Sequence, residues 1–87
     1  MISTINFSSF FKRRYKQLTD QQKADFKYAI QLFTENPFHP KLKTHKLKGK
    51  WKGFCSFSIN YSDRVLFKLS DKDTVDLINI GDHSIYR

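Results

Sequence analysis

The spacing of the apolar residues changes once along this 87-residue chain, and that change limits the folds that it can adopt. Before His39 and Pro40, the apolar side chains recur every three or four positions, which is the spacing of one face of a helix. After them, apolar and polar side chains alternate, which is the spacing of a half-buried strand. Helices followed by strands predict an α+β fold, with the helices packed on one face of an antiparallel sheet.

Two helices are expected in the first part of the chain, after a short opening strand over residues 2–5. Ser8 is the predicted N-cap of the first helix, and Thr19 with Gln22 forms a capping-box pattern at the start of the second. The apolar faces comprise Phe7, Phe11, Tyr15 and Leu18, then Phe26, Ala29, Ile30 and Phe33. Asn36 should end the second helix, because a residue that precedes proline disfavours the helical region. The two helices should form a tight hairpin.

Three more strands are expected, over residues 54–61, 64–69 and 75–80. With the opening strand they predict a twisted, mainly antiparallel four-stranded sheet in a single domain that spans residues 1–87. The alternation places these side chains toward the helices: Cys55, Phe57, Ile59, Tyr61, Val65, Phe67 and Leu69. The other face should stay uncovered and carry Ser58, Arg64 and Lys68. Residues 82–87 are interpreted as a polar tail.

The positive charge of the chain is concentrated in residues 41–52, which contain six lysines and no acidic residue. The whole chain has a formal net charge of +8, while residues 53–87 hold slightly more acidic than basic groups. A local excess of this kind favours a binding surface for a polyanion over a uniformly basic protein. The alternative is that the lysine run is a solvated connection with no partner.

Cysteine content and hydropathy suggest a reduced, cytoplasmic protein that binds no metal. Cys55 is the one cysteine, so no internal disulfide can form, and no cysteine and histidine spacing typical of zinc is present. No apolar run is long enough to cross a membrane. Neither a membrane partner nor a small-molecule cofactor is therefore expected.

Histidine, arginine and lysine together suit the cleavage of RNA by its own 2′-hydroxyl group. Histidine moves protons near neutral pH, arginine binds two phosphate oxygens at once, and preorganised cations stabilise the charge that builds on the phosphate. The chain provides His45, His83 and Arg64 besides its lysines, and His39 is interpreted as a structural residue of a turn.

Three segments resemble the RelE/ParE superfamily of bacterial toxins, most closely its RelE/StbE and YafQ-like ribonucleases. They are HKLKGKWKG at residues 45–53, RVLF at residues 64–67 and IGDHSIYR at residues 80–87. The resemblance implies the RelE-like microbial RNase fold and the toxin component of a type II toxin–antitoxin system. It further implies an mRNA endoribonuclease (mRNA interferase) that acts in the ribosomal A site without a metal, and a cognate antitoxin as partner.

The resemblance also assigns roles to individual residues. His83 matches the C-terminal catalytic histidine, His45 a histidine at the start of the lysine-rich motif, and Arg64 a strand arginine that contacts the scissile phosphate. Tyr86 or Arg87 matches a terminal aromatic or basic group, although Tyr86 follows His83 by three residues where four are expected. The groups expected to hold flanking phosphates or to stack on a base are Lys46, Lys48, Lys50, Lys52, Trp51 and Tyr86.

Two departures from the family pattern leave other interpretations open. Ser58 and Ser62 occupy positions that resemble a histidine and an aspartate of YafQ-like members, so a catalytically degenerate toxin or a plain RNA-binding module is possible. ParE-like members share the fold and act on DNA gyrase without chemistry of their own. Arg64 could also serve as an ion-pair partner of Asp82 or Asp76, and Trp51 as a packing residue.

Overall fold

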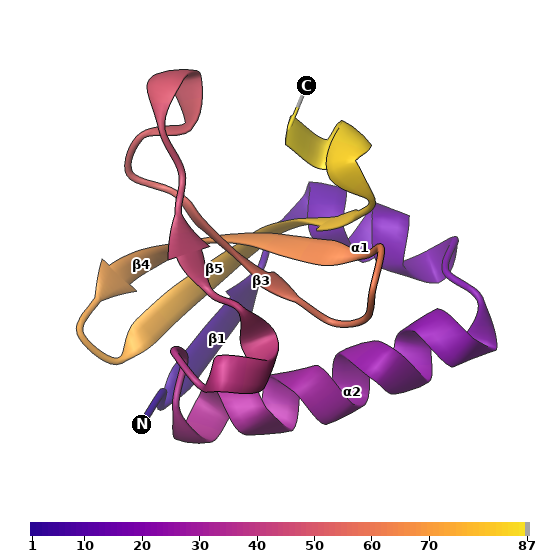
Figure 1. The fold of residues 1–87 in the computed structure, drawn as a ribbon, viewed down its shortest axis with the longest axis horizontal. Helices are drawn as coiled ribbons and strands as arrows, with labels where there is room; N and C mark the ends of the chain where they lie inside the picture. Colours follow the sequence, from indigo (N-terminus) through magenta and orange to yellow (C-terminus); the bar gives the residue numbers. More distant parts are fainter. Residues whose placement is uncertain (87) are drawn as a thin grey trace.

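The computed structural model describes residues 1–86, including all their side chains except those of His83 and Tyr86. A five-stranded sheet in the order β1-β5-β4-β3-β2 forms the framework (Figure 1). The strands are β1 (Thr4–Phe7), β2 (His45–Lys46), β3 (Cys55–Ser58), β4 (Arg64–Asp71) and β5 (Thr74–Gly81). β1 runs parallel to β5, and the other neighbouring pairs are antiparallel. The α+β class is confirmed, with one strand more than predicted because the two-residue β2 is too short to show a period.

The two helices begin where their capping residues predict. The side chain of Ser8 accepts a hydrogen bond from Phe11 N and caps α1 (Ser9–Lys16). Thr19 and Gln22 exchange both bonds of a capping box at the start of α2 (Asp20–Glu35). Asn36 is the C-cap of α2, as expected before a proline. No helix in residues 1–86 is long and apolar enough to cross a membrane.

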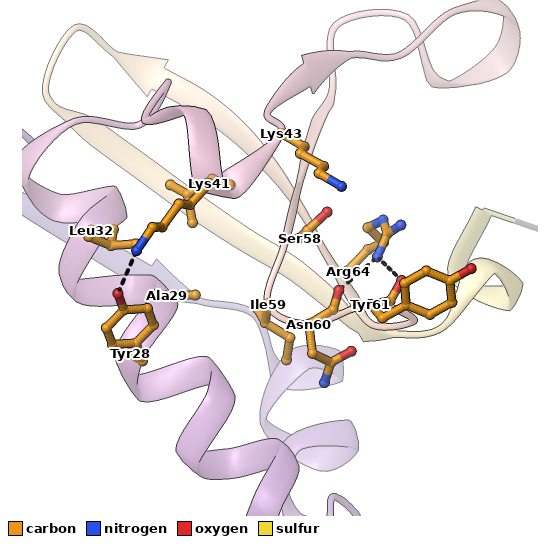
Figure 2. A pocket seen from close by; sticks show the side chains of 11 residues that line it. Tyr28, Ala29, Leu32, Lys41, Lys43, Ser58, Ile59, Asn60, Tyr61 and Arg64 are labelled. Carbon is orange, nitrogen blue, oxygen red and sulfur yellow. Dashed lines mark hydrogen bonds between the residues drawn. The ribbon is translucent and has the colours of Figure 1, made fainter.

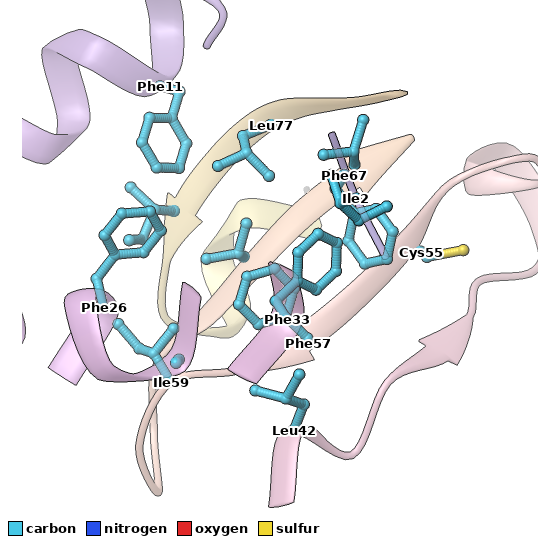
Figure 3. Close-up of a cluster of buried hydrophobic side chains, with 14 residues drawn as sticks. Ile2, Phe11, Phe26, Phe33, Leu42, Cys55, Phe57, Ile59, Phe67 and Leu77 are labelled. Atoms are coloured by element: carbon cyan, nitrogen blue, oxygen red, sulfur yellow. The ribbon is translucent and has the colours of Figure 1, made fainter. Parts of the chain in front are cut away.

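Aromatic rings fill the core between α2 and the sheet (Figure 3). Phe33 of α2 is fully buried, and its ring centroid lies 4.5 Å from that of Phe57 and 4.9 Å from that of Phe67. Phe11 joins α1 to this core through Phe26, at a centroid distance of 5.6 Å. The aromatic stripe of α2 is therefore buried against β3 and β4, while α1 packs beside β5.

Two residues predicted to face the core do not. Tyr61 is 98% exposed because β3 ends at Ser58, so the alternation does not reach the turn that follows. Leu69 is 40% exposed because β3 pairs with β4 only as far as Phe67, opposite Cys55, so Leu69 lies beyond the neighbouring strand.

The face opposite α2 is partly covered rather than open. Residues 83–86, predicted as tail, form the 3₁₀-helix η3 (His83–Tyr86) directly after β5. Leu66 faces this side and is nevertheless buried, and it lines the same small cavity as Ile85 of η3. In Figure 1, η3 and the loop that contains the 3₁₀-helix η2 (Gly49–Trp51) rise on the side of the sheet away from α2. A third 3₁₀-helix, η1 (Pro40–Leu42), follows α2.

Candidate active site

Strand register brings the candidate residues of three strands to one face of the sheet. His45 of β2 lies opposite Ser56 of β3, and two positions further along β3, Ser58 lies opposite Arg64 of β4. Residues two apart on a strand point to the same face, about 6.6 Å from one another. His45 and Arg64 therefore lie on the same face of the sheet, on the two strands that border β3, and two residues apart along it.

Hydrogen bonds orient the imidazole ring of His45. Its Nδ1 lies 3.1 Å from the carbonyl oxygen of Lys43, and its Nε2 lies 3.4 Å from Oγ of Ser56. A carbonyl oxygen can only accept, so Nδ1 donates, and in the neutral ring Nε2 is left as the acceptor. The ring is exposed on the face that Arg64 shares, and in this tautomer Nε2 accepts from the hydroxyl group of the buried Ser56.

The guanidinium group of Arg64 is anchored at one of its nitrogens. Nη1 donates to the backbone oxygens of Asn60 and Tyr61, each at 3.2 Å (Figure 2), and to that of Asp63 at 3.1 Å. Nε and Nη2 have no hydrogen-bond partner within residues 1–86 as the structure describes them. The side chain is thus held in place while part of its fork stays available to an anion. Asp76, one of the acids considered as its partner, lies opposite Lys68 instead.

The turn that holds Arg64 is itself tied to α2 by Asn60. Oδ1 of Asn60 accepts from Ser62 N and Asp63 N, and its Nδ2 donates to the carboxylates of Asp25 and Asp63. Gln22 donates a further bond to Asp63. The hydrogen bond from Asn60, then the one from Gln21, lowers the pKa of Asp25 below its ordinary value. Ser62, at the aspartate position of the family pattern, is an exposed member of this turn.

The lysine-rich segment forms a loop beside this face. A hydrogen bond of 2.9 Å from Leu47 N to Phe54 O closes the loop, and Gly49 and Gly53 have positive φ angles of 66° and 94°. The ammonium groups that it presents are all exposed: those of Lys46, Lys48, Lys50 and Lys52. The strongly basic strip expected from the sequence is therefore a solvated surface next to the sheet.

Trp51 of this loop is half-buried. Its ring meets that of Phe54 edge-on at 5.6 Å, and Nζ of Lys50 lies 5.8 Å from its centroid. It also lines a cavity of about 200 Å³ together with Arg14 and Ile85. Packing is thus one role of this tryptophan, and its predicted role in RNA binding stays a prediction.

The backbone places His83 near the end of the sheet where Arg64 begins β4. Gly81 lies opposite Arg64, and η3 begins two residues later, with Asp82 Oδ1 accepting from Ser84 N at 2.9 Å. The side chains of His83 and Tyr86, and the whole of Arg87, lie outside what the structure describes. Their predicted roles therefore remain predictions.

Two basic residues with no predicted role lie close to these groups. Lys43 lines a cleft with Arg64, and Arg14 of α1 lies against Gly81, where an added Cβ would be 2.8 Å from its Nη2. Lys43 belongs to the lysine run, and that run could have indicated a binding role for it. No local sequence pattern indicated such a role for Arg14. Among the described residues, no group of three or more His, Cys, Asp or Glu could hold a metal ion.

Comparison with known proteins places this arrangement in a family. A family model described as "Bacterial toxin of type II toxin-antitoxin system, YafQ" matches residues 3–86. The chain is similar in structure to YafQ from E. coli strain BL21(DE3), with a TM-score of 0.79, 22% identity, and 99% of this chain and 98% of that chain covered. No curated protein matches in sequence.

Two similar structures are toxin–antitoxin complexes. The E. coli DinJ–YafQ complex matches with a TM-score of 0.76 and 22% identity, over 98% of this chain and 97% of that chain. The RelBE2 complex from Mycobacterium tuberculosis matches with a TM-score of 0.76 and 18% identity, over 95% of this chain and 100% of that chain. At these identities the structural matches bear on the fold, which is that of RelE- and YafQ-like toxins.

Proposed function

This chain belongs to the YafQ family of bacterial toxins of type II toxin–antitoxin systems, and on that premise we propose that it is an endoribonuclease that cuts mRNA on the ribosome. The observation that carries the proposal is that an oriented histidine and an anchored arginine lie on the same face of the sheet. Nε2 of His45 is the acceptor end of its ring, and Arg64 lies on the same face across β3. An inhibitor without chemistry of its own needs no such acid–base group.

In the proposed reaction, Nε2 of His45 takes the proton of a ribose 2′-hydroxyl group, which replaces the Ser56 hydroxyl at that nitrogen. The 2′-oxygen then attacks the adjacent phosphorus and the bond from phosphorus to the 5′-oxygen breaks. The products are a 2′,3′-cyclic phosphate and a free 5′-hydroxyl group, to which His83 supplies the proton. A positioned acid or base of this kind typically contributes about 10²- to 10⁴-fold in rate.

Cationic groups stabilise the phosphate in this proposal. The free edge of the Arg64 guanidinium binds the non-bridging oxygens, whose negative charge grows in the transition state. The exposed ammonium groups of Lys46, Lys48, Lys50 and Lys52 hold phosphates on either side, and Arg87 adds one more. Tyr86 stacks on an unpaired base, a contact worth about 1–3 kcal/mol in comparable sites.

A cognate antitoxin is the proposed protein partner. The similar DinJ–YafQ and RelBE2 structures are complexes of a toxin with its antitoxin. A partner that covers the lysine-rich loop would need acidic groups, since that loop carries no acid of its own. Such a partner would block the substrate and neutralise the strip in one step.

The test is primer extension on a ribosome-bound message, with wild type compared with His45→Ala, His83→Ala and Arg64→Ala. We expect each variant to cut about 100-fold more slowly or worse. Lys72→Ala, in the turn between β4 and β5, is the control and should cut like wild type. Normal cutting by all three variants would refute the assignment. Arrest of gyrase supercoiling without any cut message would point instead to a ParE-type target.

A further inference from the structure

Arg64 also lines a cleft of about 170 Å³, and the reaction proposed above assigns no part of the RNA to this cleft. Its walls come from α2, from the turn after η1, from the last residue of β3 and from the turn that follows (Figure 2). Pockets for whole small molecules usually measure about 300–1,000 Å³, so this one suits a smaller group such as a phosphate with part of its sugar.

We propose that this cleft is a second nucleotide subsite, in which Lys43 binds the phosphate next to the one that is cut. The inference rests on the proposed function, because it takes Arg64 as the group that binds the scissile phosphate. The occupant is single-stranded RNA, whose next phosphate lies one nucleotide from that point.

The charge of the cleft fits an anion. Lys41, Lys43 and Arg64 line it, and none of the described lining residues is acidic. In Figure 2 the side chains of Lys43 and Ser58 extend toward the part of the cleft where Arg64 lies. Within residues 1–86, Nζ of Lys43 has no hydrogen-bond or ion-pair partner. A concave site with unneutralised cations concentrates the field that attracts a phosphate.

The nearby carboxylates do not cancel this charge from inside the cleft. Those of Asp25 and Asp63 both accept hydrogen bonds from the amide group of Asn60, and neither lines the cleft. Lys41 is engaged with the Tyr28 hydroxyl at 3.5 Å, so Lys43 is the better placed of the two lysines. The cation with a free ammonium group is thus also the one that extends toward Arg64.

The backbone of Lys43 is strained, which supports a functional role. Its φ of 50° is the one positive value among the non-glycine residues that the structure describes. Glycine or asparagine would adopt this left-handed conformation at lower cost. Lys43 adopts this conformation as the C-cap of η1, where its backbone N–H donates to the carbonyl oxygen of Pro40 at 3.3 Å, and it keeps a long cationic side chain there. Its carbonyl oxygen also orients His45, so one residue serves both the proposed base and the cleft.

An aromatic ring at the rim provides a surface for the base of the same nucleotide. Tyr61 lines the cleft and is 98% exposed, which is unusual for so large a side chain. A base attached to a sugar in the cleft can stack on this ring, since stacking tolerates any base. The subsite should therefore add affinity without strong sequence preference.

The binding experiment compares Lys43→Asn with Lys72→Asn. Both remove one positive charge, but Lys72 lies in the turn between β4 and β5, while asparagine at position 43 tolerates the left-handed backbone. The probe is a mixed-sequence heptanucleotide with 2′-O-methyl sugars, which binds but cannot be cut. Its Kd is measured at several salt concentrations, together with the melting temperature of each variant.

We expect Lys43→Asn to bind about tenfold more weakly, with the slope of log K against log salt reduced by about 0.7. Its melting temperature should equal or exceed that of wild type because the strain is removed, and Lys72→Asn should match wild type in slope. Binding by Lys43→Asn that equals binding by Lys72→Asn would overturn the subsite. Weaker binding with an unchanged slope would also overturn it, because the lost contact would not be to a phosphate.

Ribosome-bound cleavage, measured in parallel, separates the two proposals. If Arg64→Ala abolishes cutting while Lys43→Asn binds like Lys72→Asn, the subsite fails and the endoribonuclease stands. If wild type cuts no message but Lys43→Asn shows the expected loss and slope, the endoribonuclease fails and the cleft stands as a phosphate-binding site.

Discussion

Replacing Asn60 by alanine should destabilise the protein more than any other single change in the turn that precedes β4. The side chain of Asn60 accepts from Ser62 N at 3.0 Å and from Asp63 N at 2.7 Å, and donates to Asp63 at 2.9 Å. Asp63 is 6% exposed, so a lost partner there leaves a nearly buried carboxylate with one fewer donor.

The expected loss follows from these three bonds. A hydrogen bond within a protein contributes about 1 kcal/mol net, so the free energy of unfolding should fall by about 3 kcal/mol. In a domain of this size each kcal/mol corresponds to about 4–8 °C, so the melting temperature should fall by roughly 15 °C. The bond to Asp25 is counted separately, because that carboxylate lies near the surface and its smaller contribution depends on pH.

Urea unfolding of the purified protein is the assay, and Ser62→Ala is the matched control. The Ser62 hydroxyl makes one contact of 3.5 Å to Asn60, so its loss should change the free energy of unfolding by less than about 0.5 kcal/mol. A loss below about 1 kcal/mol for Asn60→Ala, or equal losses for both variants, would refute the reasoning.

The pH dependence gives a second check on Asn60. Its hydrogen bond lowers the pKa of Asp25 in the folded state, so the stabilisation is present above the ordinary pKa of 3.8 and is lost as the pH falls further. The difference in stability between wild type and Asn60→Ala should therefore shrink as the pH drops below about 4. A difference that stays constant from pH 6 to pH 3 would contradict this assignment.

Two further predictions concern the core. Phe33→Ala removes a fully buried ring and should lower the free energy of unfolding by about 4 kcal/mol in urea, whereas Phe38→Ala, at a position 54% exposed, should cost far less; equal costs would contradict the packing described. Burial raises the pKa of the Cys55 thiol, so iodoacetamide at pH 8 should alkylate the folded protein much more slowly than the urea-unfolded chain, and similar rates would show that the thiol is accessible.

The helices and the alternation of β4 could be predicted because their signals are local. The Thr19–Gln22 capping box involves residues three apart, and the buried stripe of α2 repeats within one turn. The burial of Val65 and Phe67 likewise follows from the period of a strand. The residue types of the candidate site could also be read locally, because histidine, arginine and a run of lysines each have a known chemistry.

The errors occurred where distant segments determine the outcome. Tyr61 continues the alternation of β3 in sequence, yet β3 ends at Ser58 and the turn that follows is tied to α2 by the bond from Asn60 to Asp25. Leu66 follows the strand period, but η3 covers the face that it occupies. No window of a few residues contains either contact.

The amino-acid pattern thus specifies which elements form, which faces are apolar and which chemical groups are present, because those depend on neighbours within about four positions. The placing of His45 and Arg64 on one face depends on the register of β2, β3 and β4, and the cleft at Lys43 depends on α2 lying beside the end of β3. These are contacts between residues far apart in the chain. They arise only when packing of the whole core selects one arrangement of the elements over its alternatives.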